Sequence, residues 1–364
     1  MKAITLWSFL AGVCLFAGAC HHHGHNRMVM NDGVNRVEVR YDGDIQFNDD
    51  ETAIARISPG GYLEYWRNDD HLLAGTNDKG LLQVELYENG KPIDAGSVEG
   101  KALESRVIRG MINLGFDING RIDRLYRKGG YPALLSAVDS VDGDYVRARY
   151  LERILDGDSL SAGTVAAAIG KMRDKLGSDY DKNRLLEKVD TAYLKNDSVC
   201  EDYLAAVKDM HGDYEKSQSL QHYLRVTVPV PQYVRVLDAV GSLGGNYERS
   251  NILRELIEQP LAEGRPFDSL LNLVGKMSGD YEKGNLLKQI AHKDVRENGS
   301  WAGLIRTTLT VSGEYDRTNV LVEIGQRLPK TDSLRVLYMD AAKTVHSNED
   351  YGRAVKAVEL EARK

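Results

Sequence analysis

The stretch SGDYEKGNLLKQIA, Ser278–Ala291, decides the architecture because near-copies of it recur along the chain. When the copies are aligned on the dipeptide before the apolar run, their starts lie 33 to 36 residues apart. The seven dipeptides are Asp144-Tyr145, Asp179-Tyr180, Asp213-Tyr214, Asn246-Tyr247, Asp280-Tyr281, Glu314-Tyr315 and Asp350-Tyr351. Such regular recurrence is typical of a solenoid, in which each unit buries its apolar face only against its neighbours.

Each copy has the pattern of an amphipathic helix. The first residue is acidic or an amide, which favours a helix N-cap, and a basic residue follows three places later. A small residue at offset four and apolar residues at offsets seven and ten share one helix face. A second amphipathic segment, such as FDSLLNLVGKMSG (267–279), ends at Gly or Ser before the next copy. The sequence therefore predicts a mainly α fold, an α-α solenoid of about seven helical hairpins of ~34 residues over 129–364.

The tyrosine that follows the predicted cap is present in all seven copies: Tyr145, Tyr180, Tyr214, Tyr247, Tyr281, Tyr315 and Tyr351. We expect it to fill the groove between neighbouring hairpins, and truncation of a buried aromatic to Ala costs about 3–5 kcal/mol. The alternative is a row of exposed tyrosines on the concave face that binds a partner.

Residues 34–100 have a period of two, which predicts a small antiparallel β-domain of four to six strands. Asn89-Gly90 is a strong hairpin signal, and Pro59-Gly60-Gly61 indicates a turn. Asp49, Asp50 and Glu51 could hold a cation, but they lack the spacing of a calcium loop, and a solvated turn is the simpler interpretation. Tyr62, Tyr65 and Trp66 could form a binding patch, although alternation along a strand points at least one of them inward.

Residues 101–128 are predicted to form basic linker or capping helices with a break near Gly115–Gly120. Besides Lys101 at its start, the stretch carries six basic residues: Arg106, Arg109, Arg121, Arg124, Arg127 and Lys128. We interpret them as a solvated face. The alternative is contact with an acidic partner or with lipid head groups.

Residues 1–19 have the features of a signal peptide: Lys2, then an apolar stretch, then small residues before Cys20. Ala17-Gly18-Ala19-Cys20 resembles the lipobox of bacterial lipoproteins, in which the cysteine becomes the lipidated first residue. The usual Leu three places before the cysteine is Ala17 here. Plain secretion and a retained helix are the alternatives.

Residues 20–33 are predicted to be a flexible tether rich in histidine. His21, His22, His23 and His25 could bind zinc, copper or nickel, but the cluster has no acidic or thiol partner at ligand spacing. Cys200 is left without a disulfide partner, and we expect it to be a small buried residue.

The formal charge of −7 over 364 residues, with basic and acidic residues well mixed, argues against a nucleic-acid partner. The chain has no GxGxxG after a strand, no GxxxxGK[ST] and no GxSxG. The other histidines, at 71, 211, 222, 292 and 346, are scattered along the chain. No catalytic pair can be selected, and no cofactor is expected.

The repeat has the length of a tetratricopeptide repeat but lacks its Trp-Leu-Gly-Tyr and terminal Pro pattern, so the subclass, whether TPR-like or HEAT-like, stays open. DIQFNDDETAIARISPGGYLEY (44–65) and DYEKGNLLKQIA (280–291) resemble a bacterial envelope family in which a small β-region precedes DYEK-type helical repeats. In that family similar repeats are sometimes appended to regulatory membrane zinc peptidases. The resemblance implies an architecture and an envelope setting. It implies no catalytic residue, because this chain lacks His-Glu-x-x-His.

These observations favour a membrane-tethered envelope lipoprotein that acts as a non-enzymatic scaffold for a protein or peptide, with a possible part in envelope sensing or signalling. One alternative is an enzyme, or an enzyme subunit, that acts on an envelope polymer. A second is a metal-handling protein that uses the histidine cluster.

Acylation of Cys20 is the first testable prediction. Cells fed an alkyne fatty acid should label the wild-type protein, because the lipobox-like segment directs a lipid to this thiol. Cys20→Ala should lose the label. Equal labelling of the two proteins would contradict the prediction.

Overall fold

The structure is a computed structural model that describes residues 26–31, 36–77, 79–259, 267–293 and 298–362. The chain divides into two compact units. The first comprises Met1–Lys128 with Ser140–Val146, and the second comprises Gly129–Asp139 with Arg147–Lys364.

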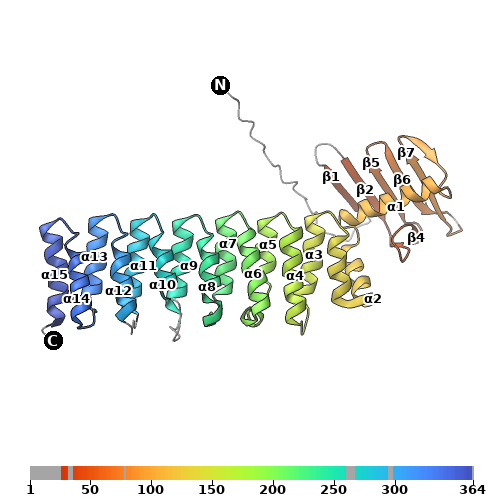
Figure 1. Cartoon of the computed structure of the whole chain (residues 1–364). Helices are drawn as coiled ribbons and strands as arrows, with labels where there is room; N and C mark the ends of the chain where they lie inside the picture. The colour runs from red at the N-terminus through yellow and green to blue at the C-terminus, as the bar shows by residue number, and fades with distance from the viewer. Residues whose placement is uncertain (1–25, 32–35, 78, 260–266, 294–297, 363–364) are drawn as a thin grey trace, which may run out of the picture. The chain divides into compact units, whose positions relative to one another are not determined.

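The first unit contains a six-stranded antiparallel sheet in the order β1-β2-β5-β6-β7-β8 and a separate two-stranded sheet, β3-β4 (Figure 1). The strands are β1 (Asn26–Asn31), β2 (Arg36–Asp42), β3 (Ile45–Phe47), β4 (Ile54–Ile57), β5 (Tyr62–Arg67), β6 (Asp70–Thr76), β7 (Leu82–Glu88) and β8 (Lys91–Ile93). The main sheet holds six of the eight strands in the described residues, which agrees with the predicted sheet of four to six strands, and the β3-β4 pair is additional.

Strand β1 lies inside the segment that the sequence predicted to be a flexible tether. It pairs with β2 along its whole length, from Asn26 opposite Tyr41 to Asn31 opposite Arg36. Without β1, strand β2 would be an open sheet edge with unpaired backbone groups. The tether prediction is therefore wrong for residues 26–31.

The turns follow the predicted chemistry. Asn89 and Gly90 both have positive φ, 52° and 74°, as a type I′ hairpin turn between β7 and β8 requires. Gly60 has φ 76° in the turn that leads into β5. One face of the sheet, with Leu63, Leu72 and Leu86, is buried, as is the apolar face of helix α1 (Val98–Asn113) from Leu103 to Ile112.

Helix α1 ends where the break was predicted, and α2 (Ile118–Asp139) follows after a turn that contains Gly115, with φ 81°. The backbone of α2 leaves helical geometry at Gly129 and Gly130, so its two parts are separate helices in effect. This kink falls at the boundary predicted for the start of the repeats.

The second unit is a two-layered array of helical hairpins. The first helix of each hairpin is called an A helix: the second part of α2, then α4 (Ala162–Lys175), α6 (Asp197–Asp209), α8 (Tyr233–Gly241), α10 (Phe267–Gly275), α12 (Asn298–Thr308) and α14 (Asp332–Ala342). The second is a B helix: α3 (Asp144–Leu155), α5 (Asp179–Leu186), α7 (Asp213–Tyr223), α9 (Asn246–Glu258), α11 (Asp280–His292), α13 (Glu314–Gly325) and α15 (Asn348–Ala362). Two short 3-10 helices, η1 (Thr191–Lys195) and η2 (Val230–Gln232), precede α6 and α8.

Each A helix packs against the next A helix and each B helix against the next B helix, from α4 to α14 and from α5 to α15. The predicted core positions of the B helices are buried. At offset seven the six leucines from Leu151 to Leu321 are fully buried, and Ala357 of the last copy is 5% exposed. The α-α solenoid of seven hairpins is confirmed for the described residues.

In the five B helices from α5 to α13, the acidic or amide residue predicted as the N-cap does not cap its own helix, so the N-cap prediction is wrong there. The predicted cap is the first helical residue in five successive B helices, and the residue before it, such as Gly279, is the N-cap. The side chain of the residue predicted as the cap instead binds the turn of the following repeat. Asp280 accepts hydrogen bonds from the backbone N–H groups of Ser312 and Gly313, at 3.1 and 2.7 Å.

The same contact recurs in the neighbouring repeats. Asp179 binds the N–H groups of His211 and Gly212, Asp213 those of Gly244 and Gly245, and Glu314 those of His346 and Ser347. In the repeat that carries an amide, Asn246 accepts from the N–H of Ser278 and donates to its Oγ. We call this contact the forward clamp, because each repeat holds the one that follows it.

Where the basic residue at offset three is a lysine, it reaches the other side of that turn. Lys216 and Lys283 are buried, and their ammonium groups donate to the carbonyls of Ser242 and Thr310 near the ends of the next A helices, at 3.3 and 2.8 Å. Lys182, also buried, donates to the Asp209 carboxylate at the end of α6. A cation at a helix C-terminus satisfies unpaired carbonyls and opposes the negative end of the helix dipole.

The pKa of Asp280 shows that the clamp favours the ionised form. Burial alone would raise this pKa, but the hydrogen bonds from Ser312 and Gly313, together with nearby Lys283 and Arg317, hold it below the ordinary value of 3.8. A lowered folded-state pKa contributes stability that is present above the ordinary pKa and is lost as the pH falls through the folded value.

Asp280→Asn should therefore reduce the loss of folding stability that the wild-type protein shows as the pH falls. At neutral pH it should cost about 1 kcal/mol, the difference between a charge-assisted and a neutral hydrogen bond. Below pH 3.8 this difference should shrink toward zero. Urea unfolding of both proteins from about pH 7 to about pH 3 measures it. Asn246→Asp is the reverse control and should gain the pH dependence. If wild type exceeds Asp280→Asn in free energy of unfolding by the same amount at both ends of this pH range, the role of the charge is contradicted.

Candidate interaction surface

Five of the repeated tyrosines project into solvent. Their exposed fractions lie between 66 and 70%, whereas the apolar positions of the same helices are buried. The five are Tyr180, Tyr214, Tyr247, Tyr281 and Tyr315, and we call them the tyrosine row. Of the two outer copies, Tyr145 is 41% exposed and Tyr351 is half-buried. The expectation that the tyrosines fill the groove between hairpins is wrong for the row.

The position of the tyrosine in the helix explains its exposure. Each side chain of a helix tilts toward the N-terminus, so a residue in the first turn overhangs the helix end. With about 100° per residue, offset one lies roughly 120° from the middle of the stripe formed by offsets four, seven and ten. Offset three lies only about 40° from it, which is why the lysines there are buried. The helical period alone therefore predicts an exposed tyrosine, whereas the size of the aromatic ring favours a buried one.

The tyrosine row follows one edge of the second unit. Its five tyrosines are the second residues of α5, α7, α9, α11 and α13, which pack side by side in that order. In Figure 1 these helices begin at the upper edge of the array, opposite the marked C-terminus at the lower end of α15. Packed helices lie about 8–10 Å apart, so the row repeats at about this interval.

Carboxylates flank every tyrosine of the row. The five turn segments 177–181, 211–215, 244–248, 278–282 and 312–316 contain nine acidic residues and no Lys or Arg. The nine are Asp179, Asp181, Asp213, Glu215, Glu248, Asp280, Glu282, Glu314 and Asp316. Each B helix has one basic residue beneath this edge, at offset three, which leaves a formal charge of −9 + 5 = −4.

The carboxylates after the tyrosines lie over the turn. A methyl group added at Gly212, Gly245 or Gly279 would meet the Oε2 atom of Glu215, Glu248 or Glu282. Glycine at the N-cap therefore allows this close approach. Glu314 is one of the carboxylates that precede a tyrosine. The hydrogen bond that it accepts from the N–H of Ser347 is the main cause that holds its pKa below the ordinary value. The edge thus carries negative charge at neutral pH.

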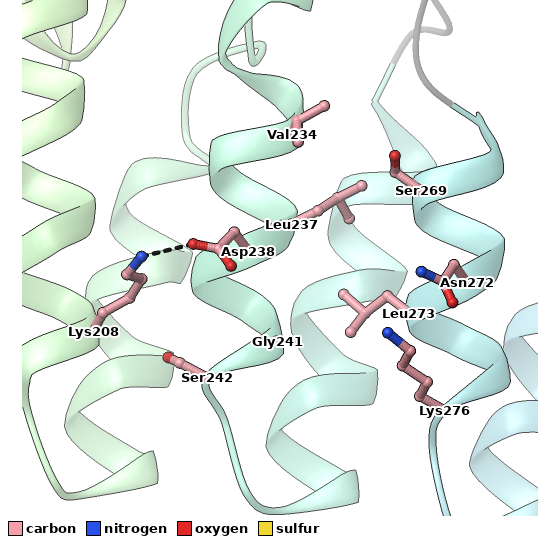
Figure 2. Close-up of a pocket in the computed structure, with 10 residues that line it drawn as sticks. All are labelled: Lys208, Val234, Leu237, Asp238, Gly241, Ser242, Ser269, Asn272, Leu273 and Lys276. Carbon is pink, nitrogen blue, oxygen red and sulfur yellow. Dashed lines mark hydrogen bonds and ion pairs between the residues drawn. The ribbon is translucent and has the colours of Figure 1, made fainter.

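The A layer has a shallow groove of about 480 Å³ between α8 and α10 (Figure 2). Val234, Leu237 and Leu273 give it apolar walls. At one end Lys208 forms an ion pair with Asp238 at 2.6 Å, and Lys276 lies at the other.

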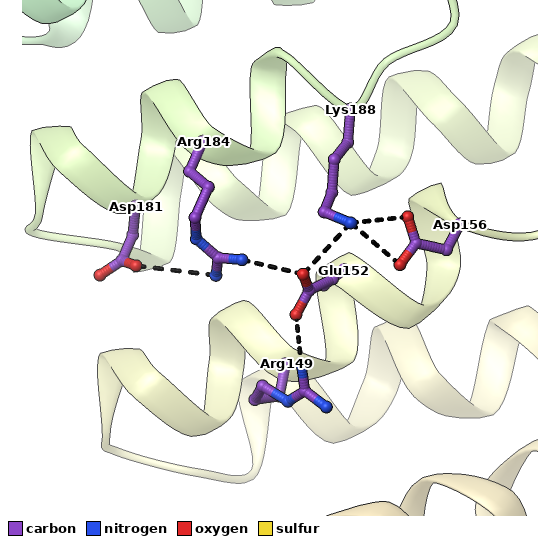
Figure 3. A network of polar contacts seen from close by, with 6 residues as sticks. All are labelled: Arg149, Glu152, Asp156, Asp181, Arg184 and Lys188. Atoms are coloured by element: carbon purple, nitrogen blue, oxygen red, sulfur yellow. Dashed lines mark hydrogen bonds and ion pairs between the residues drawn. The ribbon is translucent and has the colours of Figure 1, made fainter. Parts of the chain in front are cut away.

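The B layer carries an ion network between α3 and α5 (Figure 3). Glu152 accepts from Arg149 on its own helix, from Arg184 on the next B helix and from Lys188 in the turn after that helix. Burial alone would raise the pKa of Glu152, but Lys188 and the two arginines lower it below the ordinary value. Because every charged group of this network has a partner, we interpret it as a brace between repeats.

The outer face of the sheet in the first unit has an aromatic stack. His71 lies between Trp66 and Tyr87, with ring centroids at 4.5 and 4.1 Å. The three residues are directly opposite one another on β5, β6 and β7, so the stack is a cross-strand contact. Tyr65 points to the other face and is buried, as the alternation predicted.

Other predicted site residues have structural partners. Both carboxylate oxygens of Glu51 accept from Arg121 at 2.7 Å, and Asp50 accepts from Thr52. In the part of the chain that the structure describes, no group of three or more His, Cys, Asp or Glu residues is arranged to hold a metal ion. Residues 49–51 lie in a turn and bend between β3 and β4.

Some of the basic residues predicted for 101–128 form ion pairs with carboxylates of the first unit. Arg106 pairs with Glu88, Arg121 with Glu51, and Arg124 with Asp117. These three arginines are therefore held by the fold.

The cysteines and the histidine cluster divide between the described residues and the rest of the chain. Cys200 is a buried free thiol, and burial raises its pKa. Cys20 and His21, His22, His23 and His25 lie outside the described residues. Within the described residues, no helix is both long and apolar enough to cross a bilayer.

Comparisons with protein-family models, with curated proteins and with solved structures find no match to this chain.

Removal of a row tyrosine should leave the fold intact. Tyr247→Ala and Tyr281→Ala should melt within about two degrees of wild type, because exposed substitutions change stability little. Tyr203→Ala and Tyr338→Ala are matched controls, since both rings are fully buried and both hydroxyls donate to backbone carbonyls. Each control should lose about 3–5 kcal/mol. Thermal unfolding of the four variants measures this. A marked loss at position 247 or 281 would restore the packing explanation.

Proposed function

We propose that this chain is a lipid-anchored protein of the bacterial cell envelope and that it acts as a non-enzymatic scaffold for a protein or peptide partner. The observation that carries the proposal is the tyrosine row. The same large aromatic residue stands at the same exposed position of five successive repeats.

Packing does not explain this recurrence. The exposed ring contributes little to the core, and any residue could occupy the second position of a helix. Another position that contacts solvent varies between copies: offset eight is the partly exposed Gln221 in α7, the exposed Arg254 in α9 and the partly exposed Lys288 in α11. A requirement outside the fold explains why tyrosine is kept while its exposed neighbours change.

Tyrosine suits a recognition surface. It presents a large apolar area with few rotatable bonds and a hydroxyl that can bind a polar group, so it is enriched in interfaces and in their most important contacts. Five equivalent side chains on packed helices form a row of linked weak sites. Linked sites can reach an avidity that no single one has.

The envelope location rests on the N-terminal segment. The apolar stretch before Cys20 favours export and lipidation, and the chain after Cys20 then holds the repeats beside a membrane. The groove on the A layer supports an interaction role less well, because its lining comes from a short part of the array, whereas the tyrosine row extends over five repeats.

A cross-linking experiment tests the scaffold. The photo-reactive residue p-benzoylphenylalanine at position 247 of the full-length protein should form an adduct with a partner polypeptide in native envelopes. The same residue at position 336, where Val336 on the A layer is 61% exposed, should not. Tyr214→Ala combined with Tyr281→Ala should weaken the adduct at 247 by at least about fivefold. Equal adducts at 247 and 336 would contradict the proposal.

A further inference from the structure

We infer that the tyrosine row binds an extended cationic polypeptide segment that carries Lys or Arg at about every third residue. This inference rests on the proposed function and names the chemistry of the partner. It depends on three properties of the row: its charge, its aromatic faces and its interval.

The charge of the edge selects a cation. The nine carboxylates of the five turn segments outnumber the five basic residues below them, and no Lys or Arg lies within the turn segments. Helix dipoles do not reverse this sign, because the positive ends of the B helices and the negative ends of the A helices meet at the same edge and oppose each other. The surface therefore disfavours nucleic acid and acidic lipid, and it favours a positively charged partner.

The basic residues beneath the edge do not neutralise it for a partner. Lys216 and Lys283 are buried and already donate to carbonyls of the next repeat. Glu215, Glu248 and Glu282 lie above them against the N-cap glycines and remain partly exposed. A partner that approaches from solvent meets the carboxylates first.

The tyrosine faces add a second attraction for the same charge. An ammonium or guanidinium group over an aromatic ring is attracted by the negative face of the ring. Each repeat of the row thus offers a tyrosine and at least one carboxylate, such as Tyr281 with Glu282, within one turn of helix. This pair is a unit that can hold one cationic side chain.

The interval of the row sets the spacing of these cations. Neighbouring helices lie about 8–10 Å apart. A polyproline II chain advances about 3.1 Å per residue, so three residues span about 9.3 Å. A β-strand advances about 3.3 Å per residue and spans about 10 Å over three residues, but its side chains alternate between two faces. A polyproline II chain returns to the same face every third residue and fits the row better.

The occupant is therefore an extended segment with one cation for each repeat. A folded basic protein would present its charges at irregular intervals and could engage fewer tyrosines. A free metal ion would compete with the backbone N–H groups that Asp179, Asp213 and Asp280 already bind.

Two synthetic peptides of identical composition test the inference with the full-length protein. The periodic peptide consists of five successive Lys-Pro-Pro units. The block peptide places the same five lysines together and the same ten prolines after them. The periodic peptide should bind at least about tenfold more tightly than the block peptide, as measured by fluorescence anisotropy of a labelled peptide. Its binding should weaken as salt rises. Equal affinity for the two peptides, or no binding of either, would overturn the inference.

Variants separate the aromatic contribution from the charge. Tyr214→Ala with Tyr247→Ala and Tyr281→Ala should lower the affinity for the periodic peptide at least about tenfold, and the three matching Tyr→Phe changes should preserve most of it, because phenylalanine keeps the ring face. Full affinity in the tyrosine-to-alanine variant would overturn the inference.

The charge is tested in the same assay. Glu215→Gln with Glu248→Gln and Glu282→Gln should weaken binding of the periodic peptide and reduce its salt dependence. Val234→Ala with Val336→Ala, on the A layer, is the control and should change nothing. Unchanged affinity and salt dependence in the glutamine variant would show that the carboxylates do not select the partner.

The two proposals fail in different ways. If position 247 cross-links to an envelope polypeptide but neither lysine peptide binds, the scaffold function stands and the cationic partner is wrong. If position 247 gives no specific adduct while the periodic peptide binds in a tyrosine-dependent way, the cationic chemistry stands and the envelope partner is wrong.

Discussion

The repeat array depends on one contact, in which the carboxylate that opens a B helix accepts hydrogen bonds from two backbone N–H groups of the following turn. These N–H groups lie at the start of the next B helix and would otherwise lack partners. The basic residue three places later binds the other end of the same turn, where the carbonyls of an A helix are unpaired. Offsets zero and three lie about 60° apart on a helix, so one side of the B helix supplies both an acceptor and a donor.

This arrangement also determines where the tyrosine points. When offsets zero and three turn toward the next repeat, offset one lies on the other side of the first turn, about 160° from offset three. It has neither a neighbouring helix nor a turn to pack against. The recurring geometry of the clamp thus places an exposed position at a constant interval, whereas the choice of tyrosine at that position is not set by the clamp.

The sequence predicted the features that depend on local chemistry. The interval of about 34 residues indicated the hairpins, Asn89-Gly90 indicated the turn between β7 and β8, and the glycines near 115 indicated the end of α1. Prediction failed where a residue acts on a distant segment. Asp280 looked like a cap because capping is the common local role of Asp, whereas its partners lie 32 and 33 residues away. Strand β1 was missed because its pairing with β2 is not visible in its own short sequence. The exposure of the tyrosine row follows from the helical period, and the expectation of buried tyrosines followed only from the size of the ring.

The direction of the clamp has a consequence for the order in which the chain acquires its structure. Asp179, Asp213, Asp280 and Glu314 all bind backbone that lies later in the sequence, so no B helix can complete its contacts when it first leaves the ribosome. The clamp residue of each hairpin finds its partners only after roughly one further repeat has been synthesised. During synthesis, the last emerged B helix of the array therefore lacks its clamp contact until one further repeat has left the ribosome.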